Sequence, residues 1–246
     1  MDKKDISICT MTWARNTREE RQLRESLEQL ATLNISVFIC DGGSTSDFID
    51  FLKSYPHFNL VPGKASGVSK QVKAGMDAAY ASGSPYILYT EPDKLEFFQH
   101  SLADFLRDAM MDSQSGILLA SRTQEALETF PAFQRVTETA INNCCSEVIG
   151  KQLDYSYGPF ILNRLLVQYL DLVKDDLGWG WRQYVFGIAN RLGYGVSEIV
   201  GYFPCQVAER QDDPAERIYR IKQLSQSLNG LVQGSRESPE SPEDRK

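Results

Sequence analysis

Short apolar runs alternate with helical periodicity through the first half of the chain. The strand-like runs are bounded by Gly, Pro, Asp or Ser and cover residues 6–11, 35–40, 58–61, 86–90 and 116–120. Residues 17–33 carry leucines at spacings of three and four, with Arg and Glu between them, which predicts an amphipathic helix. This alternation is typical of βαβ units. We therefore predict an α/β fold with a mainly parallel central sheet flanked by helices.

The second half of the chain changes character. Helical patterns cover 125–150 and 163–174, an aromatic stretch with two glycines follows at 177–184, and a further helix to 192 leads into a strand at 196–202. The last helix is predicted to dock through one apolar stripe, which consists of Ile218, Ile221, Leu224, Leu228 and Leu231. Residues 233–246 are polar apart from glycine and proline. We expect a single domain at 1–232 and a disordered tail at 233–246.

Composition and charge narrow the function classes. With 42% hydrophobic residues the chain can bury a core, and a net charge of -7 disfavours sequence-independent binding to nucleic acid or an anionic membrane. No apolar run approaches the roughly 18 residues of a membrane span. The five cysteines show no CxxC spacing and are expected to be reduced and buried. These features predict a cytoplasmic protein that binds any anion at a local site.

Two strand ends carry acidic residues. Asp41 ends an apolar run and is followed by Gly42-Gly43-Ser44, where the glycines permit a turn and Ser44 can cap the next helix. Glu91 and Asp93, separated by a proline, follow the run at 86–90. Ligands bind at the carboxyl ends of strands in open α/β sheets, and hard oxygen ligands suit Mg²⁺ or Mn²⁺. A turn with a helix cap is the simpler alternative for the first motif.

A glycine-bounded helix lies between these two motifs. Gly67 precedes it, and Lys70 and Lys73 share one face near its start. A helix N-terminus with nearby ammonium groups suits a phosphate, although lysines on a solvated face are the alternative. The spacing fits no Walker A loop and no dinucleotide fingerprint, and there is no GxSxG motif. With His57 and His100 as the sole histidines, zinc and triad chemistry are disfavoured.

In their order and spacing, these motifs resemble those of GT-A glycosyltransferases of the family 2 type, closely over residues 6–93 and more loosely to 202. The resemblance implies a metal-dependent transfer of a sugar from a nucleoside diphosphate sugar to an acceptor hydroxyl, which belongs to a small or lipid-linked molecule. It implies donor-binding residues in three blocks and Glu91 and Asp93 as the DxD-like ligands of Mn²⁺ or Mg²⁺. The donor-binding residues are Thr10, Thr12, Trp13, Asp41, Gly43, Ser44, Gly67, Lys70 and Lys73.

The chain departs from this pattern at two places. Glu91 replaces the usual first Asp, and Trp181-Arg182 stands where inverting members carry an acidic base before Gly-Tyr. Asp175 or Asp176, just upstream, is our candidate catalytic base. Some retaining relatives that make glucosyl or mannosyl glycerate compounds use a late His as a metal ligand. No His follows His100, so the alternative ligands in the loop before the last helix are Glu209, Asp212 and Asp213, and Arg210 could contact the diphosphate instead.

The aromatic stretch supplies candidates for the acceptor site. Aromatic rings can stack on a sugar and arginine can bind a carboxylate or phosphate, which nominates Tyr157, Trp179, Trp181 and Arg182. Aromatic core packing is the alternative for each ring. Two other functions remain open: a catalytically silent relative that binds a nucleotide sugar or a partner protein, and a sugar nucleotidyltransferase. The second normally has a glycine-rich loop after the first strand, and residues 10–18 contain no glycine.

Overall fold

The computed structural model of the chain describes residues 2–62, 67–173, 176–206 and 210–236. Its contacts divide the chain into two compact units. Unit 1 is Met1–Met110 with Pro159–Val167, and unit 2 is Met111–Gly158 with Gln168–Lys246. The division passes through residues 1–232, and a single domain over that range stays a prediction.

Unit 1 contains a mainly parallel sheet. After a short 3-10 helix, η1 (Lys3–Asp5), its strands are β1 (Ile6–Thr12), β2 (Val37–Asp41), β3 (Phe58–Leu60), β4 (Tyr86–Tyr89) and β6 (Phe160–Asn163). They lie in the order β3, β2, β1, β4, β6, and all neighbours are parallel except β4 and β6. All of β1 is buried. The predicted α/β class and mainly parallel sheet are confirmed.

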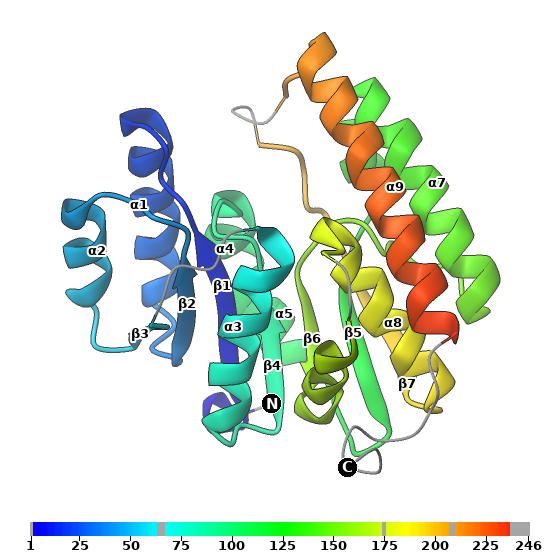
Figure 1. Cartoon of the computed structure of the whole chain (residues 1–246), viewed down its shortest axis with the longest axis horizontal. Coiled ribbons are helices and arrows are strands. Elements are labelled where there is room, and N and C mark those ends of the chain that lie inside the picture. The colour runs from blue at the N-terminus through cyan, green and yellow to red at the C-terminus, as the bar shows by residue number, and fades with distance from the viewer. Residues whose placement is uncertain (1, 63–66, 174–175, 207–209, 237–246) are drawn as a thin grey trace. The chain divides into compact units, whose positions relative to one another are not determined.

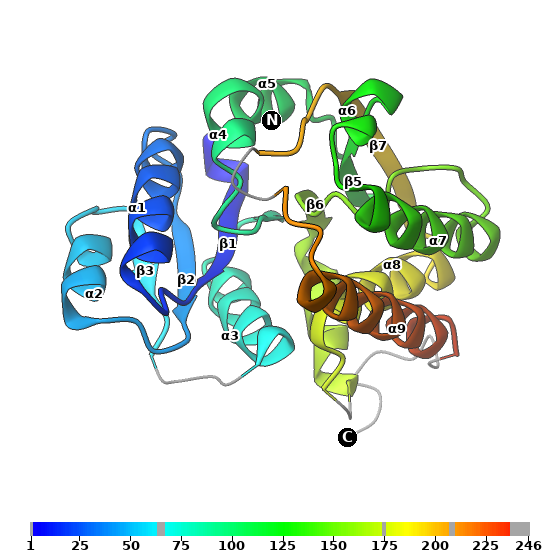
Figure 2. The same cartoon turned by 90° about the horizontal axis from the view of Figure 1, so that it is seen from above.

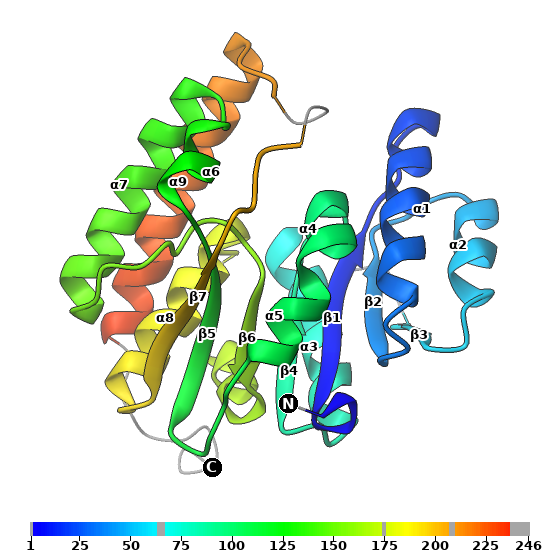
Figure 3. The same ribbon diagram turned by 180° about the vertical axis from the view of Figure 1, so that it is seen from behind.

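Helices cover both faces of the unit 1 sheet. They are α1 (Thr17–Ala31), α2 (Ser46–Lys53), α3 (Val68–Ala81), α4 (Leu95–His100) and α5 (Leu102–Asp108). Helix α3 packs on β1, β2 and β4, and the views from the front, from above and from behind place α1, α4 and α5 on the other face (Figure 1, Figure 2 and Figure 3). Such two-sided burial explains why the strands read as continuous apolar runs.

Local side-chain contacts set where α1 and α2 begin. The Glu19 N–H donates to Asn16 Oδ1 at 3.0 Å, and the Phe48 N–H donates to Thr45 Oγ1 at 3.3 Å. Each cap binds a backbone N–H that has no partner within its own helix. Helix α1 therefore begins immediately after the loop that follows β1, and α2 begins immediately after the loop that follows β2.

Unit 2 combines a parallel strand pair with long helices. The strands are β5 (Ser115–Arg122) and β7 (Gly195–Gly201), and the helices are α6 (Gln124–Glu128), α7 (Ala132–Ile149), α8 (Trp181–Arg191) and α9 (Pro214–Arg236). A short 3-10 helix, η3 (Gly178–Gly180), leads into α8. Helix α8 packs on both strands, and α9 packs on α7 and α8 (Figure 1). Among the residues that the structure describes, no helix is both long enough and apolar enough to cross a bilayer.

Helix α9 docks mainly through small residues, and the predicted stripe is correct only in its second half: Leu231 is buried and Leu224 and Leu228 are half-buried, whereas Ile221 is 53% exposed. Its buried positions are Ser227, Gly230, Leu231 and Gly234, whereas Ile218 is 69% exposed. A Cβ at Gly230 would collide with the backbone of Gly180, and one at Gly234 would collide with the backbone of Tyr184. Glycine lets the two helix backbones approach more closely than apolar side chains would.

Three further predictions change in detail. The helix predicted at 125–150 is divided into α6 and α7 at Pro131, because proline disfavours helical geometry at Phe130 and lacks an N–H. The helix predicted at 163–174 is a 3-10 helix, η2 (Arg164–Leu172), and Asn163 is instead the last residue of β6. Helix α9 continues to Arg236, so residues 233–236 of the predicted tail are helical.

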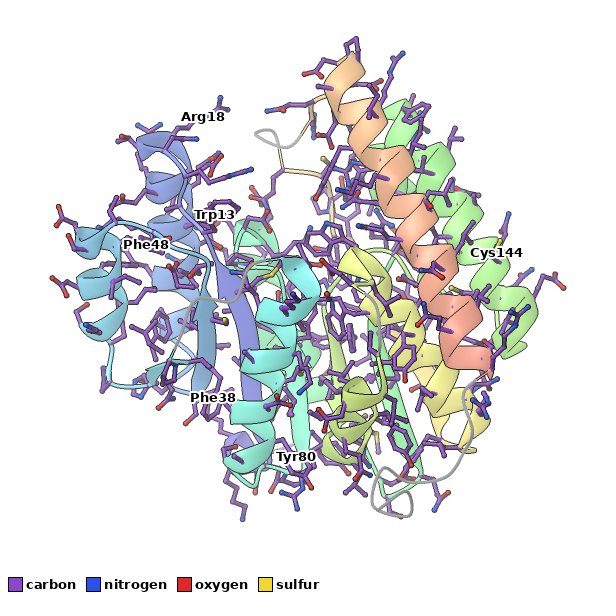
Figure 4. All side chains as sticks on the ribbon, in the orientation of Figure 1. Trp13, Arg18, Phe38, Phe48, Tyr80 and Cys144 are labelled. Atoms are coloured by element: carbon purple, nitrogen blue, oxygen red, sulfur yellow. The ribbon has the colours of Figure 1, made fainter. Side chains whose placement is uncertain are left out.

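The cysteines are free thiols, and four of the five are buried. Burial raises the pKa of Cys9, and burial raises the pKa of Cys145 to about 12. Cys144 is exposed on α7 (Figure 4), which corrects the expectation that every thiol is buried.

A buried ion-pair network stabilises unit 2 where β5 ends. The Arg122 guanidinium contacts Glu138 on α7 at 2.7 Å and Asp154 at 2.7 Å. Asp154 also accepts hydrogen bonds from Asn142 Nδ2 at 3.0 Å and from Ser156 Oγ at 3.0 Å. Burial alone raises the pKa of Asp154, but the charge and hydrogen bonds of Arg122 outweigh burial and lower the pKa to about 2. The network ties the end of β5, helix α7 and the loop at 154–156 together.

Candidate functional site

The carboxyl ends of three parallel strands meet at one edge of the unit 1 sheet. Thr12 of β1 pairs with Asp41 of β2, while Tyr89 of β4 pairs with Cys9 of β1. The chain leaves β1 toward β2 on one side, and β4 lies on the other side of β1. This is a topological switch point, the place where open α/β sheets bind ligands. We call the loops after these strands, residues 12–16, 41–45 and 90–94, the carboxyl edge.

Asp41 organises the loop after β2. Its Oδ1 accepts the N–H groups of Gly43 and Ser44 at 2.8 and 2.7 Å, and its Oδ2 accepts the hydroxyls of Thr12 and Ser44 at 2.8 and 2.6 Å. Ser44 Oγ in turn accepts the Ala14 N–H at 2.8 Å. The carboxylate therefore fixes the loop after β2 and, through Ser44, the loop after β1. The glycine at 43 is required by its backbone φ of 120°.

Trp13 presents an aromatic face at this edge. Its side chain is 53% exposed, and it lies just beyond the end of β1 (Figure 4). The Arg15 guanidinium lies 5.8 Å from the centre of its ring. Thr10 and Thr12 are buried beneath it, so they support the edge from within the sheet. An exposed indole ring is a surface on which a nucleobase can stack.

Gln71 of α3 reaches the same edge, and sequence reasoning missed it. Its Nε2 donates to the backbone oxygens of Thr12 and Cys40 at 3.3 and 3.4 Å. The one signal for Gln71 in the sequence is its polar side chain within an otherwise apolar buried face of α3, directly before Val72.

Helix α3 begins directly after Gly67, which is its N-cap residue. This residue has a φ of 100° and no side chain to cap the first turn, where a helix offers N–H groups and a positive dipole end to a phosphate. Lys70 is exposed. Lys73 forms an ion pair with Asp77 at 2.6 Å, which is the contact expected of a lysine on a solvated face. The structure therefore favours Lys70 over Lys73 as the phosphate contact, and both assignments stay predictions.

Glu91 and Asp93 follow β4 at the carboxyl edge. Thr90 N donates to Cys9 O at 3.2 Å, so the backbone still runs beside β1 at this point. Glu91 is buried and Asp93 is exposed. Within the described ranges, no group of three or more His, Cys, Asp or Glu side chains is arranged to hold a metal ion.

The donor set fits a hard divalent cation of the Mg²⁺ or Mn²⁺ kind. Both candidate ligands are carboxylates, and such ions commonly take one or two protein carboxylates and complete their shell with water and substrate phosphate oxygens. A site of this type depends on the phosphates of a bound nucleotide. Metal binding by Glu91 and Asp93 stays a prediction.

The remaining candidates lie in unit 2. Asp175 lies outside the described residues. Asp176 is exposed, and its Oδ1 accepts the Gly178 N–H at 3.0 Å, which starts the turn into η3. Of the alternatives in the loop before α9, Glu209 is not among the described residues, Asp212 pairs with Arg217 at 2.8 Å, and Asp213 caps α9. A role for Asp176 as a base stays a prediction.

The four predicted acceptor residues differ in their surroundings. Trp179 is half-buried, donates its indole N–H to Tyr219 Oη at 2.7 Å and lies 5.5 Å from the Arg182 guanidinium. Trp181 is 2% exposed, and Tyr157 is buried in a stack on Phe203 with ring centres 5.2 Å apart. Burial favours core packing for Trp181 and Tyr157, and Arg182 is also buried at 8% exposure but lies beside the half-buried Trp179 ring. Tyr219 gave no sequence signal because it comes from α9, forty residues away.

Comparison with known proteins identifies the fold class of the chain. No protein-family model matches the chain, and no curated protein matches its sequence. Solved structures of nucleotide-diphospho-sugar transferases match nearly the whole chain. The chain has the GT-A fold.

Three of the similar structures belong to two enzymes, a glucosyl-3-phosphoglycerate synthase and a mannosyl-3-phosphoglycerate synthase. Glucosyl-3-phosphoglycerate synthase from Mycobacterium tuberculosis in complex with UDP matches with a TM-score of 0.67 and 11% identity, over 94% of this chain and 80% of that chain. The same enzyme with Mn²⁺, UDP and phosphoglyceric acid gives a TM-score of 0.63 at 12% identity over 96% and 80%. Mannosyl-3-phosphoglycerate synthase from Rubrobacter xylanophilus gives 0.65 at 13% identity over 98% and 79%.

Proposed function

We propose that the protein is a metal-dependent glycosyltransferase that moves a sugar from a nucleoside diphosphate sugar to an acceptor hydroxyl. The observation that carries the proposal is the carboxyl edge of unit 1, where Asp41 and Glu91 follow strands on either side of β1. Support comes from the GT-A fold and from the similar enzymes, whose structures hold UDP and Mn²⁺.

The donor is assigned to the loops after β1 and β2. Trp13 offers a stacking surface for the base, and Asp41 and Ser44 hold the backbone on which the nucleoside rests. The hydrogen bonds that fix these loops exist before any ligand is present, so little ordering is needed when the donor binds. Binding to preorganised groups loses less conformational entropy.

The diphosphate is assigned to the N-terminus of α3 and the residues after β4. Gly67 and Lys70 place N–H groups and an ammonium group there, and Glu91 and Asp93 would hold the cation. A bound Mn²⁺ or Mg²⁺ supplies Lewis-acid stabilisation of the negative charge that develops on the leaving diphosphate. The helix dipole and Lys70 stabilise the same charge from the protein side.

The acceptor is assigned to unit 2 residues. Arg182 is a fixed positive charge that can bind a carboxylate or phosphate, and the Trp179 ring beside it can cover a sugar face. A structure of the similar glucosyl-3-phosphoglycerate synthase holds phosphoglyceric acid, which is such an anion. Asp176 is proposed as the base that accepts the proton of the acceptor hydroxyl, because it is exposed and carries a carboxyl group, a side chain that serves as a general base in enzymes.

A thermal-shift panel tests the proposal. UDP-, GDP- and dTDP-sugars are added with and without Mn²⁺, to the native chain and to Asp93→Asn. We expect one donor to raise the unfolding temperature more with Mn²⁺ than without it, and the Asp93→Asn variant to lose the metal-dependent part. If no nucleotide sugar stabilises the native chain, the proposal is wrong.

Turnover separates an enzyme from a silent relative. With the stabilising donor and Mn²⁺, the enzyme should release nucleoside diphosphate slowly by donor hydrolysis and faster with an acceptor such as phosphoglycerate. Binding with no release under either condition would favour the silent relative.

A further inference from the structure

We infer that Gln71 is a positioning residue that holds the loops carrying Trp13 and Asp41 at the spacing needed for donor binding. The inference rests on the proposed function, because it assumes that these loops bind the nucleoside diphosphate sugar. It assigns a role to a side chain on α3 that neither the GT-A resemblance nor the motif spacing indicates.

Gln71 links the ends of two strands through one amide group. It lies one turn into α3, is 5% exposed, and donates to the carbonyl oxygens of Thr12 and Cys40 at 3.3 and 3.4 Å. Thr12 is the last residue of β1, and Cys40 precedes the last residue of β2. A carboxamide carries two N–H donors, one for each carbonyl. The side chain therefore spans the point at which the two loops leave the sheet.

Packing and backbone hydrogen bonding do not by themselves call for a glutamine. The other buried positions of α3 are Val72, Gly75, Met76 and Ala79, and an apolar side chain at 71 would avoid the cost of burying an amide. Thr12 O already accepts the Gly42 N–H at 2.7 Å, so this carbonyl has a partner without Gln71. What the amide adds is a fixed distance between two strand ends.

The same amide lies against the backbone on which Trp13 rests. A Cβ added at Gly42 would lie 2.8 Å from Gln71 Nε2 and 3.1 Å from Trp13 Cβ and Cγ. Gln71, Gly42 and Trp13 are thus packed without room for one more methyl group. Movement of the Gln71 amide would shift Gly42, and with it the surface that supports the exposed indole.

The test compares Gln71→Met with a control in the same helix. Methionine keeps the length of the side chain and removes both hydrogen bonds, and it is a volume-conserving change. The control is Val72→Ala, which removes buried core volume from the next residue and leaves the two carbonyl contacts intact. Affinity is measured by calorimetry with UDP-glucose, GDP-mannose and dTDP-glucose in the presence of Mn²⁺, and the stability of each variant is measured by thermal unfolding.

The inference predicts that Gln71→Met weakens binding of the donor that the native chain prefers by about tenfold, a change of 1.4 kcal/mol in binding free energy. Val72→Ala should weaken it less than twofold while lowering the unfolding temperature more. The indole N–H resonance of Trp13, the one tryptophan in unit 1, should shift in Gln71→Met and stay in place in Val72→Ala.

Each outcome decides between the two proposals. Unchanged affinity and an unchanged Trp13 resonance in Gln71→Met would overturn the positioning role and leave the proposed function intact. Failure of the native chain to bind any of the three donors would overturn both. If Gln71→Met does not fold, Gly42→Ala replaces it. This variant should displace the Gln71 amide and also weaken donor binding, and equal affinity would again refute the role.

Discussion

The ionised carboxylate of Asp154 should stabilise the folded protein, and removing its charge should measurably lower the free energy of unfolding. In Asp154→Asn the carboxylate becomes a neutral amide of the same shape. The wild-type carboxylate accepts hydrogen bonds from Arg122 N, Nε and Nη2, from Asn142 Nδ2, and from the N–H and hydroxyl of Ser156. An amide offers one oxygen in place of two and places an NH₂ group against these donors.

The magnitude follows from the shift in pKa. The pKa of Asp154 is about 2 in the folded protein against an ordinary value of 3.8. A difference of nearly two units corresponds to about 2.5 kcal/mol in favour of the ionised folded state. Because the folded pKa is lowered, this contribution is fully present above about pH 5 and is lost as the pH falls toward 2. We therefore expect Asp154→Asn to lower the free energy of unfolding by about 2 to 3 kcal/mol at pH 7.

Urea unfolding at pH 7, 5, 4 and 3 measures this. The difference between wild type and Asp154→Asn should be constant from pH 7 to pH 5 and should shrink below that. Glu138→Gln is the matched control, because Glu138 accepts one hydrogen bond from Gln134 at 2.7 Å and pairs with a single guanidinium nitrogen. It should cost less than Asp154→Asn. A difference below about 0.5 kcal/mol at pH 7, or one that does not change with pH, would refute the reasoning.

Three further changes have expected outcomes. Asp213→Ala removes the α9 cap and should cost about 1 kcal/mol in urea unfolding, and no change would mean that α9 does not need this cap. Gly230→Ala should lower the free energy of unfolding by at least about 2 kcal/mol, because the added Cβ meets the Gly180 backbone. Gly195→Ala is the control and should lower it clearly less, because its Cβ would lie 3.5 Å from the nearest atom, Gln114 O. Equal losses of stability would contradict the close approach of the two backbones. Tyr219→Phe should shift one tryptophan indole N–H resonance and leave the other two unchanged, and three unchanged resonances would exclude the bond to Trp179.

The parallel part of the fold could be predicted from sequence because its central strands β1 and β4 are almost wholly buried and its strands sit between turn residues. Residues 86–90 were predicted to form a strand, and β4 covers Tyr86–Tyr89. β6 was not predicted. Its four residues, Phe160–Asn163, are stabilised by antiparallel pairing with β4, a partner some seventy positions earlier in the chain. Local periodicity carries no information about such a partner.

The docking of α9 shows a different limit. Hydrophobic patterns identify the face that buries large side chains, and here the buried face also carries Gly230 against the Gly180 backbone and Gly234 against the Tyr184 backbone. Close backbone approach is a property of two helices together, so a glycine in one helix reveals it only once its counterpart is known.

The residues of the candidate site also fall into those that the sequence nominates and those that only the structure reveals. Asp41 and Glu91 were nominated because they stand at strand ends, which are visible in the sequence, and Trp13 through the GT-A resemblance; their roles stay predictions. The register of the parallel sheet brings the ends of their strands to one edge. Gln71 and Tyr219 come from other elements and make their contacts through side-chain hydrogen bonds, and neither follows a spacing rule.

Crystals grown with Mn²⁺ and the donor that stabilises the protein most would test the central claim directly. Anomalous scattering from manganese locates the ion without reference to the protein chemistry around it. The account predicts a manganese peak beside the carboxylates of Glu91 and Asp93, bridged to the diphosphate, with the base over Trp13. A nucleotide bound away from the ends of β1, β2 and β4, or a manganese ion held by other residues, would contradict it.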